Sequence, residues 1–182
     1  MNRLTLYLSN GKAHVWIGIG GALALNGTVR QGNVRVDLVR LMLYSNGAPK
    51  VKTLWELSNV PLIIISGLSY MGIGRRLELA PNDLSFIEAP DHFTAFKLLK
   101  KGRAKYLLNY EVTSQLGVKS MESADLRAMV VQKIPLYFLV SNALENAGEL
   151  LAKLDQALLD IRKEDSYSIA DKCDVKIKPN KE

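Results

Sequence analysis

The chain has 182 residues, of which 48% are hydrophobic and 23% charged, a composition typical of a soluble globular protein with a sizeable core. Its formal net charge is +6, and basic residues cluster at 97–105 and at 172–181. Neither cluster has the interleaved aromatic residues of a nucleic-acid groove, so no nucleic-acid partner is expected. The single cysteine, Cys173, excludes an internal disulfide. The two histidines, His14 and His92, lack a Cys/His cluster, which argues against a metal site.

The first quarter of the chain predicts one helix and two extended segments. We expect a helix over 2–9, a strand over 14–19, a loop over 20–33 and an extended crossing segment over 34–44. No apolar run reaches membrane-spanning length. The apolar stretch 15–25 also resembles the core of an export signal, but the apolar-periodic residues before it favour a helix that leads into a buried strand.

The middle of the chain predicts strands that alternate with short helices. Thr53 and Glu56 form a capping-box pattern that predicts a short helix. The continuous apolar run 60–65 predicts a strand buried on both faces. A helix over 70–79 and a strand over 84–87 follow.

The next segment predicts a capped helix and another buried strand. Asp91 is the expected N-cap of a helix that ends at Gly102 and has Phe93, Phe96 and Leu99 on its inner face. The remaining expectations are a strand over 106–108, a helix over 109–116, a strand over 136–140, an amphipathic helix over 144–161 and a polar tail. Alternating strands and helices predict an α/β fold with a mostly parallel sheet.

A small pattern occurs twice. Residues 8–15 and 99–106 each combine a helix end, a glycine, a basic residue, an alanine and a strand. Two similar α/β lobes would explain this repeat, and so would a coincidence between two ordinary helix-to-strand turns.

The order and spacing of several segments resemble a known family. These segments are the Gly-Lys-Ala-His-Val run at 11–15, the connection at 52–57, the strand and turn at 62–70, the stretch 95–108, and the strand at 137–141 before the long helix. Together they resemble the family 3 extracellular solute-binding proteins, which are the periplasmic receptors of polar amino-acid ABC transporters. The resemblance runs from about residue 4 to about residue 168.

This resemblance implies a periplasmic-binding-protein-like fold of type II, with two lobes that close on a ligand. Residues 1–46 would form part of lobe one, 50–137 lobe two, and 138–182 the return to lobe one. The first strand and helix of the family have no counterpart here, so lobe one is expected to be incomplete. The family usually has Asp at the positions of His14 and Lys105, and an acidic residue at Asn109 that would hold a ligand amine.

The turn Ser66-Gly67-Leu68-Ser69-Tyr70 is the first candidate ligand contact. It follows a buried strand and opens a helix, so free N–H groups and the helix dipole can receive a carboxylate. Ser69 can donate through its hydroxyl, and Tyr70 can pack over the ligand. The alternative is a plain strand-to-helix turn.

Four further residues complete the candidate site. Asn109 and Tyr110 follow a strand and are expected at the same edge of the sheet as the Ser66 turn. The alternative for Asn109 is a plain helix N-cap, a common role of asparagine. Trp16 lies on the first strand. Its alternative role is that of a half-buried core residue. Arg30 can pair with a ligand acid, or lie in solvent.

Searches for dinucleotide, phosphate-loop, nucleophile-elbow and zinc-protease motifs find none, so no catalytic residue, cofactor or metal is expected. The leading hypothesis is a non-catalytic periplasmic protein that binds a small polar solute, an amino acid or related carboxylate, and serves an ABC transporter permease. The alternative is a structural protein that covers an exposed sheet by self-association, for example as a homodimer.

Overall fold

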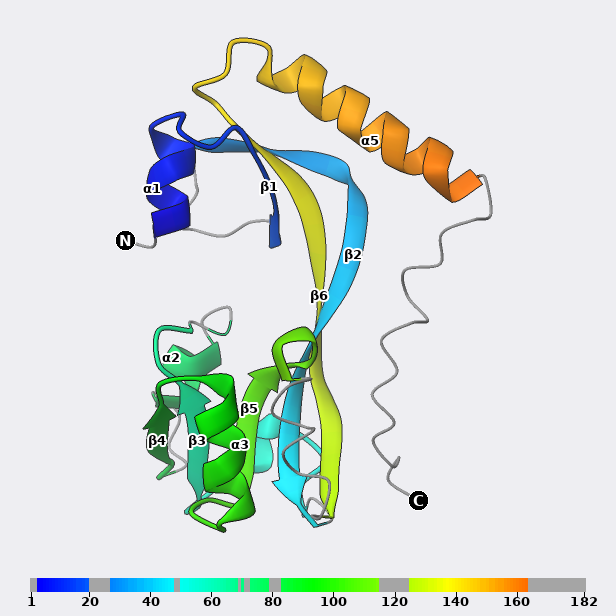
Figure 1. Ribbon diagram of the computed structural model, residues 1–182. Coiled ribbons are helices and arrows are strands. Elements are labelled where there is room, and N and C mark those ends of the chain that lie inside the picture. Colours follow the sequence, from blue (N-terminus) through cyan, green and yellow to red (C-terminus); the bar gives the residue numbers. More distant parts are fainter. Residues whose placement is uncertain are drawn as a thin grey trace. The chain divides into compact units, whose positions relative to one another are not determined.

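The computed structural model describes residues 3–19, 27–47, 50–68, 70, 73–78, 83–114 and 125–163. In chain order, its elements are α1 (Arg3–Ser9), β1 (Val15–Ile19), β2 (Val29–Asn46), η2 (Leu54–Glu56), β3 (Pro61–Ile65), α2 (Ile73–Glu78), β4 (Ser85–Ala89), α3 (His92–Lys100), β5 (Tyr106–Tyr110), β6 (Leu126–Ser141) and α5 (Ala147–Lys163) (Figure 1). None of these helices is long and apolar enough to cross a membrane.

The strands join in the order β1-β6-β2-β5-β3-β4. Strand β3 pairs in parallel with both β4 and β5, whereas β5 is antiparallel to β2, and β1 is antiparallel to β6. The predicted α/β class is therefore confirmed, with parallel pairing gathered around β3.

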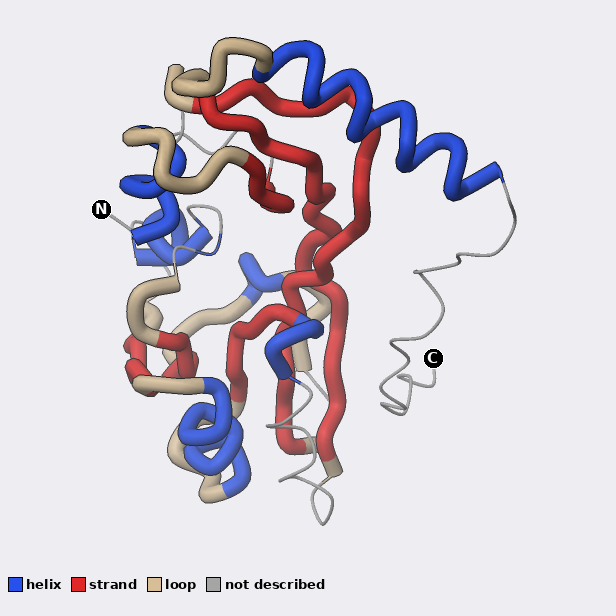
Figure 2. Tube along the Cα trace, turned by 45° about the horizontal axis from the view of Figure 1, so that its top comes forward, coloured by secondary structure: helices blue, strands red, loops and turns tan. Residues whose placement is uncertain are grey.

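The chain divides into two compact units. Unit one contains residues 1–38 and 134–172, and unit two contains 39–133 and 173–182. Each of the long strands β2 and β6 contributes residues to both units, because the division falls inside these strands. In the chain trace of Figure 2, each of these strands is drawn as one long red run.

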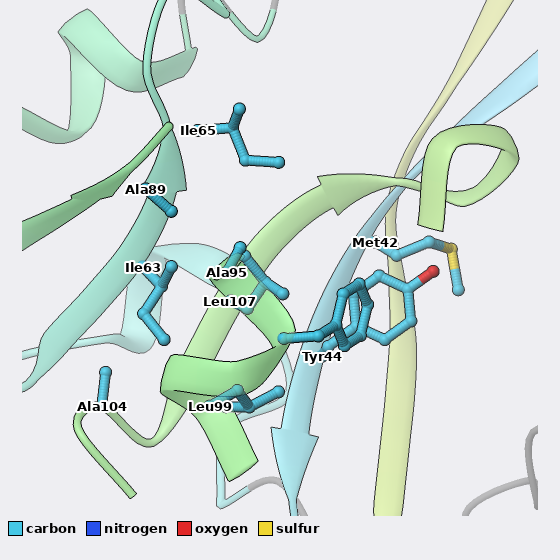
Figure 3. Close-up of a cluster of buried hydrophobic side chains, with 10 residues drawn as sticks. Met42, Tyr44, Ile63, Ile65, Ala89, Ala95, Leu99, Ala104 and Leu107 are labelled. Carbon is cyan, nitrogen blue, oxygen red and sulfur yellow. The ribbon is translucent and has the colours of Figure 1, made fainter. Parts of the chain in front are cut away.

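Unit two is built on the apolar strand β3. Ile63 lies level with Ile87 of β4 and with Leu107 of β5. Helix α3 covers one face of this sheet and closes a core in which Tyr44 meets the ring of Phe96 edge-on at 5.1 Å (Figure 3). The buried side chains of this cluster are Met42, Tyr44, Ile63, Ile65, Ala89, Ala95, Phe96, Leu99, Ala104 and Leu107.

Helix α3 follows its predicted limits. The Asp91 carboxylate accepts a hydrogen bond from the Thr94 N–H at 2.8 Å, and Gly102 takes the left-handed conformation at φ +68°. The prediction that Phe93 faces inward is wrong, since its side chain is 46% exposed with the Lys97 ammonium 4.4 Å above the ring. The buried face is set by the 95, 96 and 99 positions, and Phe93 lies beyond its edge.

Several elements begin or end at residues other than the predicted ones, in part because pairing with neighbouring strands lengthens the strands. Asn109 and Tyr110, expected to begin a helix, belong to β5, where Met42 and Leu41 of β2 pair with them. Part of the predicted loop, from Val29 onward, is strand β2. The capping-box segment forms a single 3-10 turn, in which Glu56 accepts from the Lys52 N–H at 2.8 Å. The helix predicted over 70–79 is α2, at 73–78.

Unit one rests on β1, β6 and α5. Ile17 pairs with Phe138 across the antiparallel strands, and Leu151 of α5 packs against Val140. The buried Ser141 hydroxyl donates to the Leu8 carbonyl at 2.6 Å and so holds the end of α1. The tail after 163, and residues 20–26 of the predicted loop, lie outside the described residues.

Candidate functional site

The carboxyl ends of β3 and β5 meet at one edge of the sheet in unit two. The two strands are parallel, with Ile63 level with Leu107, so the turn after Ile65 lies beside Asn109. The rings of Tyr70 and Tyr110 stack with their centroids 5.8 Å apart and an interplanar angle of 24°. The structure thus brings the two predicted segments together; we call this place the carboxyl edge.

The turn itself has fewer free donors than the sequence predicted. The Ser66 N–H donates to the Ala89 carbonyl at 2.9 Å, and the Leu68 N–H donates to Ile65. The Ser66 hydroxyl donates to the Glu88 carboxylate at 2.8 Å. Gly67, at φ +80°, is exposed, and a Cβ there would meet no atom of the described residues within 4 Å. Ser69 lies outside the described residues.

Tyr70 is part of the core and does not offer its ring to solvent. It is only 1% exposed, and its hydroxyl accepts a hydrogen bond from the Ile65 N–H at 2.7 Å. Its φ of +47° is left-handed, which is uncommon for a tyrosine. Burial raises its pKa to about 12. Tyr70 thus anchors the turn against Tyr110, a half-buried residue whose pKa is also raised by burial.

Asn109 is completely buried, and the oxygen and the NH₂ group of its side chain differ in their hydrogen bonds. Its Oδ1 accepts from the Tyr110 N–H at 2.8 Å and from the Thr113 hydroxyl at 3.3 Å. His92 Nδ1 lies 3.1 Å from the same oxygen and donates in the tautomer that carries its proton there. The Nδ2 amide group is buried and has no partner among the described residues.

The amide orientation follows from these neighbours. The Tyr110 N–H is a donor and cannot face an NH₂ group, so Oδ1 must point toward it. A buried unpaired donor costs about 1–3 kcal/mol and is uncommon in native structures. Within the part of the chain that the structure describes, the carboxyl edge therefore has a hydrogen-bond donor without an acceptor.

A charged pair lies on the elements next to this amide. Arg40 of β2 and Glu111, which follows β5, form a salt bridge of 2.8 Å, with side chains 36% and 15% exposed. The buried Tyr44 hydroxyl lies near the Ser114 hydroxyl, which itself donates to the Tyr110 carbonyl. Burial raises the pKa of Tyr44 to about 12.

Trp16 and Arg30 belong to unit one, whereas the residues described above at the carboxyl edge belong to unit two. Trp16 lies on β1 with its side chain 45% exposed, and a Cβ added at Gly18 would lie 2.7 Å from its ring. The Arg30 guanidinium lies beside Gly148, the second residue of α5. Their ligand roles stay predictions.

His92 and Thr113 were not among the predicted site residues. Asp91, recognised as a helix cap, placed His92 at the first position of α3, but only the tertiary packing turns its ring toward Asn109. The described residues contain no cluster of three or more His, Cys, Asp or Glu side chains able to hold a metal ion.

No family model matches this sequence, and no curated protein matches it. Several solved structures match the fold. The GluR0 ligand-binding core in complex with L-glutamate gives a TM-score of 0.68 at 11% identity, over 88% of this chain and 71% of that chain. An ancestral arginine-binding protein bound to arginine gives 0.64 at 19% identity, over 90% and 72%. The substrate-binding protein of an amino acid ABC transporter gives 0.61 at 11% identity, over 89% and 70%.

These identities are low, and the likeness is one of fold. It confirms that the chain has the periplasmic-binding-protein-like α/β fold that its sequence resembles. The chain corresponds to about 70% of the length of these neighbours.

Proposed function

We propose that this protein is a non-catalytic solute-binding protein that holds a small polar carboxylate at the carboxyl edge of unit two. The observation that carries the proposal is the buried Nδ2 group of Asn109, which finds no acceptor among the described residues. In open α/β sheets, ligands gather at the carboxyl ends of the strands, and this donor lies at such an end. The shared fold supports the same class of function, because the neighbours described above bind amino acids.

The chemistry of Asn109 selects the ligand atom that can face it. Its oxygen already has three neighbours able to donate, so it has little capacity left for a ligand ammonium group. Its NH₂ group requires an acceptor. An amino acid or related acid would therefore direct a carboxylate or carbonyl oxygen toward Asn109. Affinity comes from such hydrogen bonds and from no covalent step.

A thermal-shift screen tests the binding. The probes are glutamate, arginine and glutarate, which share a carboxylate and differ in their amine groups. A ligand present at 100 times its Kd stabilises the folded state by about 2.7 kcal/mol. The absence of any shift with all carboxylates at millimolar concentration would contradict the proposal.

The substitution Asn109→Asp tests the direction of the contact. Aspartate keeps the acceptor for Tyr110 and Thr113 but replaces the donor with a negative oxygen. We expect carboxylate affinity to fall about tenfold or more. If Asn109 instead holds an ammonium group, the same substitution strengthens binding of amino acids. Asn10→Asp is the matched control, because Asn10 is exposed and uses its oxygen as an acceptor.

Delivery of the solute to an ABC transporter permease in the periplasm is the finer part of the proposal. It rests on the fold shared with a substrate-binding protein of an amino acid ABC transporter. Co-purification with a membrane fraction that contains the permease, dependent on ligand, would test the partnership.

Self-association is the second candidate function. Strand β1 is an edge strand, and Val15, Trp16 and Ile17 are 39%, 45% and 46% exposed, so apolar side chains reach solvent on both faces. Sedimentation equilibrium over a hundredfold range of concentration distinguishes the cases. A homodimer that Trp16→Glu dissociates supports self-association, and a monomer at every concentration argues against it.

A further inference from the structure

Unit two contains a cavity of about 330 Å³ at the edge of its sheet opposite the carboxyl edge. Lys105 precedes β5 and Tyr106 begins it, Val60 precedes β3, and Ser45 lies near the end of β2. Because β2 runs antiparallel to β5, the end of β2 and the starts of the other two strands share this edge. The cavity is thus separate from the cluster around Asn109, and its volume is within the range of small-molecule pockets.

The charge at the cavity is positive. The side chains of Lys50 and Lys105 line it, and neither ammonium group has an ion-pair partner among the described residues. Glu56 is the acid in the lining, and both its oxygens are engaged. One accepts from the Lys52 N–H at 2.8 Å and the other from the Thr53 hydroxyl at 3.3 Å. An anion would therefore meet two cations and one carboxylate whose oxygens are already hydrogen-bonded, so the lining keeps a net positive charge.

Two hydroxyl groups add donors to the same lining. The oxygen of Tyr106, a buried residue, accepts from the Lys50 N–H at 3.2 Å, so the phenolic proton remains available. Ser58 Oγ likewise accepts from Asn59 at 3.2 Å and keeps its proton. The Ser45 hydroxyl is different, because it donates to the Gly47 carbonyl. The hydroxyl groups of Tyr106 and Ser58 thus supply donors to the cavity, which favours an anion over a cation.

The remaining wall is apolar. Val51, Leu57 and Val60 line the cavity, and Leu57 is only 1% exposed. A hydrated inorganic ion would leave these side chains without a partner. A short hydrocarbon chain would bury its surface against them and gain about 25 cal/mol for each Å² removed from water.

We infer that this cavity is a second ligand site, which binds a short-chain aliphatic carboxylate. The carboxylate lies against Lys105 and the Tyr106 hydroxyl, and the hydrocarbon chain lies against Val51 and Leu57. The site is independent of the function proposed for the carboxyl edge, because no residue of one lines the other.

Titration of the full ¹⁵N-labelled chain with butyrate, followed by amide chemical shifts, tests the inference. We expect the largest shifts at Lys105, Tyr106 and Ser58, and none at Gly67. Inorganic phosphate supplies charge without a chain, and butanol supplies a chain without charge. Both should bind at least about tenfold more weakly than butyrate, because each loses one kind of contact.

Matched lysine substitutions complete the test. Lys105→Gln should weaken butyrate binding by about tenfold or more, the usual loss for a charge-assisted hydrogen bond. Lys101→Gln makes the same charge change four positions earlier, at an exposed residue outside the lining, and should leave the affinity unchanged. Equal affinities in the two variants, shifts confined to Gly67, or phosphate binding as tight as butyrate would each overturn the inference.

Discussion

Replacing Tyr70 with phenylalanine removes one oxygen atom from the core of unit two. That oxygen accepts the Ile65 N–H at 2.7 Å, and both residues are buried. The ring itself can stay, because its stacking on Tyr110 does not involve the hydroxyl. The substitution therefore isolates the cost of leaving one buried backbone donor at the end of β3 unpaired.

A buried donor that loses its acceptor costs about 1–3 kcal/mol. A loss of about 2 kcal/mol lowers the melting temperature of a chain of this length by about 4–8 °C. Tyr44→Phe is the matched control: the Tyr44 hydroxyl is also buried, but among the described residues it accepts no backbone N–H and its neighbour is the Ser114 hydroxyl, so its removal should cost less than removal of the Tyr70 hydroxyl.

Urea unfolding followed by tryptophan fluorescence measures both variants. The chain has two tryptophans, and Trp16→Phe leaves Trp55, in unit two, as the reporter. Trp55 lies in η2 with the Arg76 guanidinium 4.7 Å from its ring. We expect a lower urea midpoint for Tyr70→Phe than for Tyr44→Phe. Equal midpoints would refute the argument that the hydrogen bond to Ile65 holds the turn.

Three other outcomes follow from the same structure. Burial raises the pKa of Tyr44 and Tyr70 from 10.0 to about 12, so the free energy of unfolding should be fully retained below pH 10 and decline between pH 10 and 12 in an alkaline urea series. Asp91→Ala should lower the urea midpoint at pH 7; because the Thr94 N–H lowers the pKa of this carboxyl, the difference should disappear as the pH falls below 3.8. Gly32→Ala should destabilise unit one by about 1–3 kcal/mol, measured by calorimetry, because the new Cβ would lie 2.5 Å from the buried Asp155 carboxylate.

The elements predicted most closely were those specified by neighbouring residues. The apolar run that forms β3 is hydrophobic enough on both faces to require a buried strand wherever it lies. Asp91 and Gly102 act on the backbone within one helical turn, so the limits of α3 can be predicted without knowledge of the tertiary structure. The 3.6-residue periodicity of α5 is equally local.

Longer-range pairing decided where several strands end. Asn109 and Tyr110 have the sequence of a helix start, but hydrogen bonds from β2 hold them in β5. The exposure of Phe93 likewise depends on which part of α3 the sheet covers. Such outcomes follow from partners that are distant along the chain, and a local pattern contains no information about them.

The candidate site likewise has one part that could be predicted from the sequence and one part that only the tertiary structure decided. The predicted order of strands along the chain was enough to place the Ser66 turn and Asn109 at one edge, because the carboxyl ends of parallel strands coincide. The tertiary structure decided what those residues have left to offer a ligand. The Ser66 N–H is already bonded to Ala89, whereas the oxygen of Asn109 has three neighbours able to donate and its NH₂ group has no acceptor among the described residues. A hydrogen-bond balance depends on every group within about 3 Å, and only the folded chain brings those groups together.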